Sequence, residues 1–584
     1  MAAEPGESLV FEGVSPRPVL TWATDGPWQV DGDLSPGVDV ERFAPQGLTP
    51  AAGRSAFRIG KLAEPPTATW DLQLRGPTAG TVREGDRLLA RFWMRCDDSM
   101  TGQAYTQLAF ERATTNYDKS VLIELTTGRE WKRFDVAFEA HDDFAPGEAQ
   151  LVLQLGFGRQ RVEVAGASLW NYGKALEVDD LPSVDLSYEG RALDAPWRQA
   201  AAERIEKLRK GDLVVTVRDA QGNPMPGAQV SVELTRHAFP FGTAVAVGGL
   251  VGQSADDQRY REVLKNNFNY FVFENAMKWN NHNIGTPEQI DAALDWLEAN
   301  GIPGRGHVLV WPSWIYIPEH IEALASNPER LRAAVNARVT DTATRYRGRL
   351  TDWDVINETV ANTDLMEVLG YEEMTEWFKL ARKADPDAGL FLNDYAILSG
   401  GARDTGHQNR YYELLQGLID QGAPMTGIGM QGHFGSNLTA PERLWEILDR
   451  FSAFGLPIRV TEFDIDIRDE QLQADYMRDF LTAMFSHPSV DGVLIWGFWE
   501  NRHWRARAAL YRADWSIRPQ GQAWRDLVYG QWKTEETVAA GDDGSAAFRG
   551  FKGDYRVVVR HNGDTQTATI AIGSDPSTLE LTLP

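Results

Sequence analysis

The sequence has 584 residues, 43% of them hydrophobic and 24% charged, which is the composition of an ordinary globular protein with several domains rather than of a disordered or fibrous chain. Its formal net charge of −25 disfavours binding to nucleic-acid phosphates and to anionic lipid headgroups. The single cysteine, Cys96, excludes an internal disulfide and a thiolate zinc site, and no apolar run approaches the length needed to cross a bilayer.

The first part of the chain is rich in short β-type segments. From about residue 9 to 172, alternating or β-rich runs recur between turn residues, and no clear helical pattern interrupts them. The clearest runs are 87–96, 105–114, 132–140, 149–157 and 161–170. This spacing predicts an all-β sandwich, which we place at residues 1–185. Apolar residues at helical spacing in 195–212 then predict a helix, within a linker over residues 186–211.

Two incomplete sets of strands lie on either side of the central part of the chain. Residues 212–234 have the pattern of a β-hairpin around a Gly-Asn-Pro turn, and residues 544–584 again consist of strands and turns. Because two strands cannot bury a core alone, we predict that residues 212–237 and 537–584 form one small Ig-like β-sandwich, with the central part inserted in it. The alternative is two unrelated appendages. The apolar residues expected to cover one another are Leu213, Val215, Val217, Val230 and Val232 on one side, and Tyr555, Val557, Val559, Ile570 and Leu581 on the other.

The central part, residues 238–536, alternates strand and helix eight times. Helical patterns follow the strands, for example in 287–301 and 440–455, with proline near the start and glycine at the end. Eight such units predict a (β/α)8 TIM barrel, whereas a doubly wound dinucleotide fold is disfavoured because no Gly-x-Gly-x-x-Gly follows a strand. The predicted strands are 240–247, 270–277, 305–311, 352–358, 390–395, 428–434, 457–464 and 493–499.

Polar and aromatic residues stand at the carboxyl ends of seven of these strands. In a barrel of this kind those ends face the active site. Any one such residue alone is more often structural, but seven strands ending in carboxylate, amide, imidazole or indole favour a binding site. The residues are Glu274 and Asn275, His307 and Trp311, Asn357 and Glu358, Asn393 to Tyr395, Gln431 and His433, Glu462, and Trp496.

This set of side chains has the chemistry of glycoside hydrolysis. One carboxyl group protonates the leaving oxygen, and a second attacks the anomeric carbon or activates water. Amides and imidazoles can hold sugar hydroxyls, and the 20 tryptophans of the chain offer flat apolar faces for sugar rings. The ligand spacing of a metal site and the Gly-x-Ser-x-Gly of a serine hydrolase are absent from the sequence, so we expect no metal and no cofactor.

Seven motifs in this region resemble those of glycoside hydrolase family 10, the retaining endo-β-1,4-xylanases. About a hundred residues separate the two glutamates, as in that family, and the resemblance covers about half of the chain. The motifs are FENAMKW (273–279), RGHVLVW (305–311), TDWDVINE (351–358), LNDY (392–395), GMQGH (429–433), VTEFD (460–464) and WGFWENRHW (496–504).

The resemblance implies a role for each matching residue. Glu358 corresponds to the general acid/base and Glu462 to the nucleophile. Asn357 corresponds to the residue that holds the 2-hydroxyl of the sugar being cleaved, and His433 to the one that hydrogen-bonds the nucleophile. Tyr395 is expected to contact substrate as well. The glycone-side pocket corresponds to Glu274, Asn275, Lys278, His307, Trp311, Gln431, Trp496 and Trp504.

The motifs depart from the family at the rim of the site. Pro312, Ser313 and Trp314 follow the second motif, RGHVLVW, where the family has His then Ser, and Ala396 follows Tyr395 where it has Asn. The last motif adds Trp499 and His503. These changes leave both glutamates in place, so they bear on which xylan decorations are accepted rather than on the chemistry.

The first module resembles, more weakly, the jelly-roll carbohydrate-binding modules attached to such enzymes, through 129–140 and 162–173. Alternation along its strands should bury about half of its aromatic residues. These include Trp22, Trp28, Trp70, Trp93, Tyr105, Tyr117 and Trp131.

The resemblance implies a retaining endo-β-1,4-xylanase acting on xylan or decorated xylan. The alternatives are an exo-acting or other β-glycosidase on xylo- or gluco-oligosaccharides, and a non-catalytic polysaccharide-binding protein. We expect a monomer whose partner is xylan or a xylo-oligosaccharide, without nucleic acid or membrane. Because xylan is too large to enter a cell, we expect a secreted or periplasmic protein, although the start MAAEPGES lacks the features of a signal peptide.

Overall fold

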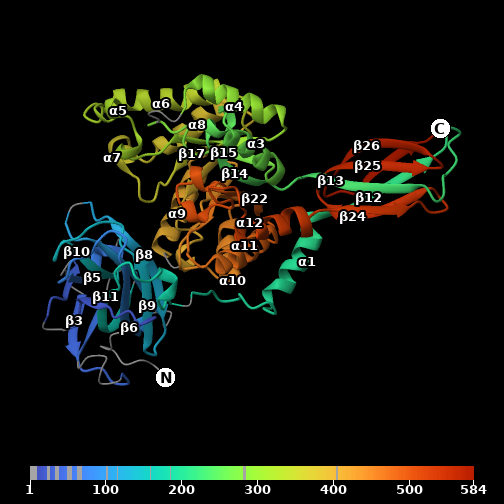
Figure 1. The fold of residues 1–584 in the computed structure, drawn as a ribbon. Helices are drawn as coiled ribbons and strands as arrows, with labels where there is room; N and C mark the ends of the chain where they lie inside the picture. Colours follow the sequence, from blue (N-terminus) through green and yellow to red (C-terminus); the bar gives the residue numbers. More distant parts are fainter. Residues whose placement is uncertain are drawn as a thin grey trace. The chain divides into compact units, whose positions relative to one another are not determined.

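The computed structural model describes residues 10–22, 26–32, 38–48, 55–61, 69–99, 103–114, 116–157, 159–184, 186–280, 285–402 and 405–584 (Figure 1). These residues form two compact units, Met1–Ser187 with Gly435–Asn437, and Tyr188–Phe434 with Leu438–Pro584. Within the described ranges, no helix is both long and apolar enough to cross a membrane.

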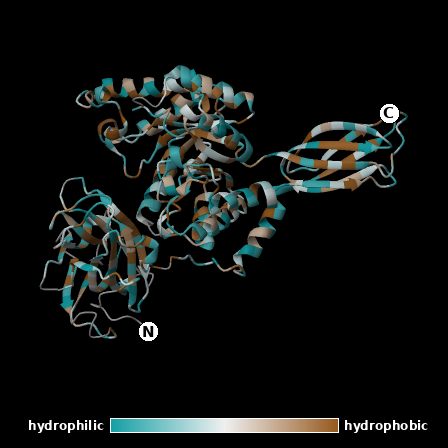
Figure 2. Cartoon of the chain, in the orientation of Figure 1, coloured by the Kyte–Doolittle hydropathy of each residue, from teal (hydrophilic) through white to brown (hydrophobic). Residues whose placement is uncertain are grey.

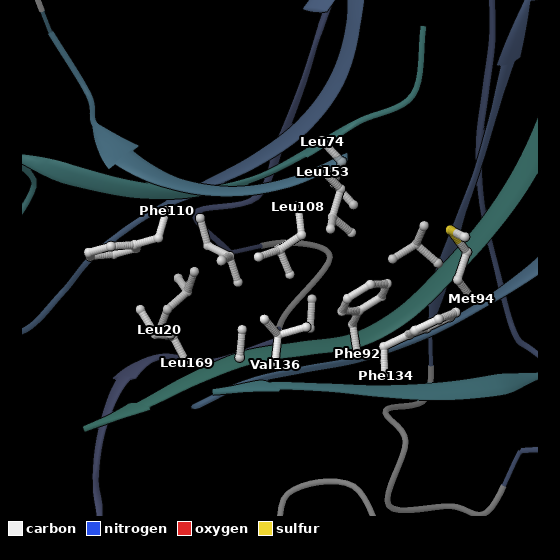
Figure 3. Close-up of a cluster of buried hydrophobic side chains, with 14 of the residues drawn as sticks. Leu20, Leu74, Phe92, Met94, Leu108, Phe110, Phe134, Val136, Leu153 and Leu169 are labelled. Carbon is white, nitrogen blue, oxygen red and sulfur yellow. The ribbon is translucent and has the colours of Figure 1, made fainter. Parts of the chain in front are cut away.

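The first unit is a sandwich of two antiparallel sheets. One sheet has the order β3-β4-β11-β6-β9, with β1 paired to β11, and the other has the order β2-β5-β10-β7-β8. Figure 3 shows Leu74, Leu108, Phe110 and Leu153 of the second sheet pointing towards side chains of the first, and all of them are buried. The strands are β1 (Arg17–Leu20), β2 (Gln29–Gly32), β3 (Val38–Phe43), β4 (Ala56–Lys61), β5 (Leu72–Pro77), β6 (Arg87–Ser99), β7 (Ala104–Arg112), β8 (Lys119–Thr127), β9 (Lys132–Glu139), β10 (Ala149–Gln154) and β11 (Gln160–Asn171).

The aromatic residues of this unit divide as alternation predicts. Trp28, Trp93 and Tyr105 are buried, whereas Trp70 and Tyr117 are 63% and 53% exposed. The partly buried Trp22 and Trp131 complete the set. The exposed rings are therefore the ones available to a ligand.

The predicted linker helix is α1 (Trp197–Arg209), and it is anchored on the barrel. Arg209, at its end, donates from Nε to the carbonyl of Phe485 at 2.6 Å and from Nη2 to the carbonyls of His487 and Val490. Burial lowers the pKa of Arg209 to about 10. At the other end of the helix, the Trp197 ring meets that of Trp445 edge to face.

Both ends of the chain's second unit contribute to one small sandwich, as predicted. β12 (Lys210–Arg218) pairs with β24 (Ser545–Phe551) and, in parallel, with β27 (Ser577–Thr582). β13 (Gln229–His237) pairs with β23 (Glu535–Ala539) and β25 (Gly553–His561), and β26 (Asp564–Ile572) extends that sheet. Along β25 buried and exposed residues alternate, and Figure 2 shows apolar and polar segments alternating in these strands.

The structure corrects one detail of this sandwich. The predicted hairpin over 212–234 does not exist, because β12 and β13 belong to different sheets. Each strand finds its partners among the C-terminal strands, which lets the valines of both face one core. Ile570 is only half-buried, and Ile572 is the buried isoleucine of β26. The other apolar residues predicted for this core are buried.

The eight predicted central strands form a closed parallel barrel. The ring runs β14-β15-β16-β17-β18-β19-β21-β22, and β22 pairs back to β14. The short β20 follows β19 and pairs with the end of β21, placing His433 opposite Asp464. The bounds are β14 (Phe241–Val245), β15 (Tyr270–Phe273), β16 (Gly304–Val310), β17 (Asp352–Asn357), β18 (Gly389–Asp394), β19 (Gly427–Met430), β20 (His433–Phe434), β21 (Ile458–Ile465) and β22 (Val490–Ile495).

Helices alternate with the barrel strands, and their ends follow local chemistry. α4 begins at Pro287, with Thr286 and Gln289 forming a capping box, and the glycine after it, Gly301, has a φ of +65°. The helices are α2 (Val247–Val251), α3 (Ala255–Asn267), α4 (Pro287–Ala299), α5 (Glu319–Glu322), α6 (Pro328–Arg345), α7 (Asp364–Leu369), α8 (Glu373–Ala384), α9 (Thr405–Asp420), α10 (Pro441–Ser452), α11 (Glu470–Phe485) and α12 (Pro519–Arg525).

The two chain segments that connect the small sandwich to the barrel pack against each other. Phe241, at the start of β14, stacks on Trp532, which precedes β23. His237, at the end of β13, contacts Phe241 and Phe551 edge to face. The predicted fold class is therefore confirmed: a TIM barrel, an N-terminal β-sandwich and a small sandwich built from both sides of the barrel. The exact boundaries between linker, small sandwich and barrel stay a prediction.

Candidate active site

The two predicted catalytic glutamates lie at the carboxyl ends of barrel strands, tied to their neighbours by the backbone. Glu358 directly follows β17, and its N–H donates to the carbonyl of Asn393 on β18 at 2.8 Å. Glu462 lies in β21, and its N–H donates to the carbonyl of Gln431, which follows β19, at 3.0 Å. The parallel strands thereby bring residues about a hundred positions apart to one end of the barrel.

Three amide side chains connect the two carboxylates. Gln431 donates to Glu358 Oε1 at 2.8 Å and lies 3.5 Å from Asn357 Oδ1. Asn393 donates to the same Asn357 oxygen at 2.9 Å and to Glu462 Oε1 at 2.8 Å. All three amide residues are buried, so a largely buried hydrogen-bond network connects the two glutamates.

Glu358 has the environment of a proton donor. Its φ of +58° lies in the left-handed region, which residues other than glycine rarely occupy and which is found at functional sites. Burial raises the pKa of Glu358 to about 7, the nearby carboxylates of Glu462 and Asp394 act in the same direction, and the hydrogen bond from Gln431 opposes them. Near neutral pH this carboxyl group can therefore both give and take a proton.

Glu462 has the opposite environment. Burial by itself would raise its pKa, but the hydrogen bond from His433 and the charges of His307, His433 and Lys278 together hold the pKa of Glu462 below its usual value. His433 lies between two carboxylates, 3.1 Å from Glu462 Oε2 and 3.0 Å from Asp464 Oδ2. Although burial opposes it, this pairing raises the pKa of His433 to about 9, so the imidazole is a cation at neutral pH.

A second cluster of predicted residues follows β15. Lys278 donates from Nζ to Asn275 Oδ1 at 2.8 Å, and its ammonium lies 5.2 Å from the ring centre of Trp311. Burial lowers the pKa of Lys278, while the charges of Glu462, Glu274 and Glu358 oppose this. Burial likewise raises the pKa of Glu274. Ring contacts join this cluster to the same site, because Trp311 meets His307, and Trp496 meets both His307 and His433.

The aromatic residues surround His307. Its ring meets Trp496 edge to face at 5.2 Å and Trp311 at 6.2 Å between centres, and its Nδ1 lies 2.9 Å from Asp354 Oδ2. Trp311 also stacks on Tyr316, with ring centres 3.6 Å apart. These contacts fix the rings that the sequence assigned to the sugar pocket.

Tyr395 and Trp504 occupy different places. Trp504 is 52% exposed, donates from Nε1 to Asp464 Oδ2 at 2.7 Å and lies 4.8 Å from the His433 ring, so it extends the site outwards. Tyr395 packs against His407, which pairs with Asp394 at 3.0 Å. The substrate contact expected of Tyr395 stays a prediction that rests on the resemblance.

Several residues that organise the site are not predicted from the sequence. Asn393 is among the predicted strand-end residues, but the sequence does not predict the two hydrogen bonds that it donates, to Asn357 and to Glu462. Asp464, the last residue of VTEFD, pairs with His433, and Asn362 donates to Glu358 Oε2 at 3.2 Å. Only Asn393 and Asp464 stand inside recognisable motifs. Among the described residues, no group of three or more His, Cys, Asp or Glu is arranged to hold a metal ion.

Comparison with known proteins assigns the chain to a family. The profile of glycosyl hydrolase family 10 matches residues 232–524, half of the chain. The chain is 33% identical over 392 residues to anti-sigma-I factor RsgI6 of Acetivibrio thermocellus, covering 66% of this chain and 50% of that protein. It is 30% identical over 427 residues to endo-1,4-beta-xylanase 1 of Arabidopsis thaliana, covering 71% of this chain and 44% of that protein.

Solved structures include xylanase 10B of Thermotoga petrophila RKU-1 in complex with xylobiose, with a TM-score of 0.46 and 24% identity over 50% of this chain and 95% of that one. The chain spans half or less of the length of the two curated relatives named above. Because the family profile covers half of its residues, the chain belongs to glycosyl hydrolase family 10.

Proposed function

We propose that this chain is a retaining endo-β-1,4-xylanase that hydrolyses xylan or decorated xylan without a cofactor. The observation that carries the proposal is one hydrogen-bond network that joins two glutamates, the buried Glu462 and the half-buried Glu358, whose pKa shifts are opposite: raised to about 7 for Glu358 and lowered for Glu462. A retaining glycosidase needs one carboxylic acid and one carboxylate at neutral pH. Family membership and similarity to proteins named endo-1,4-beta-xylanase give the substrate class.

The reaction proceeds in two displacements. In the first, Glu462 attacks the anomeric carbon and forms a covalent ester with the sugar, while Glu358 gives its proton to the leaving glycosidic oxygen. In the second, Glu358 takes a proton from water, whose oxygen attacks the anomeric carbon and releases Glu462. Glu462 attacks one face of the sugar and water attacks the opposite face, so each displacement inverts the anomeric configuration and the two together retain it; the two carboxyl groups should lie about 5–5.5 Å apart.

The remaining residues position these groups. The cationic His433 keeps Glu462 ionised until the ester forms, and Asn393 fixes the orientation of the Glu462 carboxylate. Asn357, Tyr395 and the Glu274–Asn275–Lys278 cluster bind sugar hydroxyls. The rings of Trp311, Trp496 and Trp504, with His307 and Gln431, line the pocket for the sugar chain on the non-reducing side of the cleaved bond.

Two substitutions and one spectrum test the mechanism. Glu462→Ala should abolish turnover, whereas Glu358→Ala should keep activity on an activated aryl β-xylobioside and be accelerated by azide. As a matched control, Glu446→Ala, an exposed carboxylate on α10, should change neither. Proton NMR of the first-formed product should show the β-anomer. An α-anomer at early time would refute the double displacement.

One observation favours a second candidate. The relative with 33% identity is named an anti-sigma-I factor rather than an enzyme. This name supports the alternative of a non-catalytic polysaccharide-binding protein. Both carboxylates and their network are nevertheless in place, which favours catalysis. Product profiles on xylan, carboxymethylcellulose and short xylo-oligosaccharides distinguish endo-acting from exo-acting cleavage. Release of no reducing sugar from any of them would refute the enzymatic proposal.

We further propose that the first unit is an accessory carbohydrate-binding module and that the protein acts as a monomer outside the cytoplasm, in the secreted or periplasmic fraction. The supporting arguments are the β-sandwich with exposed Trp70 and Tyr117 and the size of the polymer substrate. Fractionation of the native source tests the location, since detection in the cytosol alone would favour an enzyme for imported oligosaccharides. Gel filtration with light scattering tests the oligomeric state.

A further inference from the structure

The turn that follows Glu358 brings a second amide back to this residue. The backbone N–H of Asn362 donates to the Glu358 carbonyl at 3.0 Å. The Asn362 side chain donates from Nδ2 to the same carbonyl and to Glu358 Oε2, both at 3.2 Å. One half-buried asparagine therefore contacts both the backbone and the carboxyl group of the proton donor.

The partners of the Asn362 amide fix its orientation. A backbone carbonyl only accepts hydrogen bonds, so the atom that faces the Glu358 carbonyl is the amide nitrogen. Because the same nitrogen faces Glu358 Oε2, the amide acts on the carboxyl group as a donor. A donor binds a carboxylate more strongly than a protonated carboxyl group. The contact between Asn362 and Glu358 therefore strengthens when the proton leaves.

The neighbouring strand holds this turn in place. Asp394, a buried residue at the end of β18, accepts at Oδ2 from the backbone N–H of Val360 at 3.2 Å. The hydroxyl of Thr359 lies 3.5 Å from the same oxygen. Both donors lie between Glu358 and Asn362 in the chain. The position of the Asn362 amide beside the carboxyl group is thus set by the backbone of the turn as well as by its own contacts.

The two oxygens of Glu358 have different donors. Gln431 donates to Oε1 at 2.8 Å, and its nitrogen also faces Asn357 Oδ1, an oxygen that accepts from Asn393. The bond from Asn362 to Oε2 is longer by 3.2 against 2.8 Å. The shorter bond marks Oε1 as the oxygen that stays an acceptor in the protonated acid. The proton of Glu358 is therefore assigned to Oε2.

The other groups that interact electrostatically with Glu358 come from elements outside its own turn. They are Asp394 of β18, His433 of β20, Glu462 of β21, Lys278 after β15, and Tyr316 of the turn Trp314–Tyr316. Burial and the two carboxylates raise the pKa of Glu358, whereas the hydrogen bond from Gln431 and the imidazolium oppose this. All of these groups remain when Asn362 is replaced, so a change in the titration of Glu358 then reports the asparagine.

We propose that Asn362 is a positioning residue for proton donation: through Nδ2 it holds Glu358 Oε2 as the oxygen that carries the proton and stabilises the negative charge that develops there. Gln431 keeps Oε1 as an acceptor throughout, so the two amides give the two oxygens different roles. The inference rests on the proposed function in one respect, that the reaction begins with proton transfer from Glu358 to a glycosidic oxygen.

The step at Oε2 belongs to the first displacement. The Oε2–H bond breaks, its proton passes to the glycosidic oxygen, and its electron pair stays on Oε2, where the Asn362 N–H meets it. The bond from the anomeric carbon to the leaving oxygen breaks with its pair on that oxygen, while Glu462 forms the ester. Asn362 therefore acts most strongly where the leaving group needs a proton.

The first test is the pH dependence of kcat/KM of the full chain on phenyl β-xylobioside. Asn362→Ala removes a donor to the carboxylate, so the pKa of Glu358 should rise and the basic limb, near pH 7 in the parent, should move up by about one unit. One unit is a tenfold change, or about 1.4 kcal/mol, the size of one hydrogen bond. Asn362→Asp, which puts a carboxylate in the same place, should move the limb further up.

The second test compares leaving groups, each at the pH optimum of the variant. Asn362→Ala should lower kcat/KM about three- to tenfold on phenyl β-xylobioside and less than about twofold on the dinitrophenyl glycoside, whose leaving group needs no proton. Asn300→Ala is the matched control. Asn300 likewise donates its N–H and Nδ2 to the carbonyl four residues earlier, that of Trp296, but it lies at the end of α4, before β16. Its replacement should change neither measurement.

A basic limb that stays in place or moves down in Asn362→Ala would overturn the inference. An equal loss of kcat/KM with both leaving groups would do the same, since a merely structural role predicts it. The position of the limb does not depend on how much protein is folded, and should Asn362→Ala not fold at all, Asn362→Asp decides by its own shift.

The proposed function is tested separately by the parent. Should the parent turn over no xyloside, the proposed function fails by itself. Carbon NMR of protein labelled at the glutamate carboxyl groups, with Glu358→Gln for assignment, then decides whether Asn362→Ala raises the pKa of Glu358. An unchanged or lowered pKa would refute the role of Asn362.

Discussion

Replacing His433 by asparagine tests the electrostatic design of the active site. The substitution keeps a polar side chain but removes the positive charge that lies 3.1 Å from Glu462. Activity requires Glu462 ionised and Glu358 protonated, so the pH profile of kcat/KM should fall on the acid side as Glu462 gains a proton and on the basic side near pH 7 as Glu358 loses one. Without the imidazolium, the pKa of Glu462 rises and the acid limb moves to higher pH.

The expected size of this change follows from the pKa of His433. A pKa of about 9, compared with the ordinary 6.5, corresponds to about 3 kcal/mol in favour of the charged imidazolium. Asp464 and Glu462 share this interaction. If half of it belongs to Glu462, the acid limb should move up by about one pH unit. The basic limb should move up only slightly, because the charge of His433 is the least of the named influences on Glu358.

The same interaction affects stability. Because the folded pKa of His433 lies above its unfolded value, its contribution is fully present below about pH 6.5 and is lost as the pH rises through about 9. Relative to His433→Asn, the wild type should therefore lose up to about 3 kcal/mol of unfolding free energy over that interval, measured by urea denaturation.

The assay is the pH dependence of kcat/KM on an aryl β-xylobioside. His487→Asn is the matched control, since His487 is also buried and lies 3.1 Å from a carboxylate, that of Asp449, but it precedes β22 and so lies away from the carboxyl ends of the barrel strands. It should leave both limbs in place. An acid limb that stays in place or moves down in His433→Asn would refute the reasoning, because the charge would then not govern the ionisation of Glu462.

Three further changes probe other parts of the molecule. Asn393→Ala removes one charge-assisted hydrogen bond, to Glu462, and two neutral ones, with Asn357 and Thr461, so kcat on the same substrate should fall about 100-fold; a decrease of less than threefold would contradict the role given to this amide. Arg459→Met takes from the buried Asp352 a partner at 2.7 Å and should lower the free energy of unfolding by about 3–5 kcal/mol, as urea titration would measure. Deletion of residues 537–584 removes the partners of β12 and β13 and should lower the Tm or cause aggregation, whereas an unchanged Tm and activity would show that the small sandwich does not depend on them.

Much of the site could be predicted from sequence because the barrel imposes a simple geometric rule. Side chains at the carboxyl ends of parallel strands meet, so recognising the strands was enough to bring Glu358 and Glu462 to one end of the barrel. Their partners did not follow from the rule. The amide of Asn393 serves residues 36 and 69 positions away, and the choice of partner depends on rotamers that strand order does not specify.

The opposite pKa shifts of the two glutamates also required tertiary structure. Both are glutamates at strand ends, and nothing local distinguishes a proton donor from a nucleophile. The difference arises because His433 lies against one of them, held there by the pairing of β20 with the end of β21, while burial among carboxylates dominates at the other. The position of a glutamate in the sequence does not predict how far its carboxyl group is desolvated, because desolvation depends on every chain segment that excludes water from it.

The small sandwich shows the same division. The alternating apolar residues in 212–237 and 537–584 determined that the apolar face of each set of strands must be buried against the other set. The barrel is therefore an insertion between them. Which strand pairs with which was decided only in three dimensions, where β12 and β13 separate into two sheets instead of forming a hairpin. By itself, the sequence determined which faces must be buried and which residue types stand at the strand ends. The tertiary structure decided their partners, because pairing and desolvation are properties of neighbours brought together from distant parts of the chain.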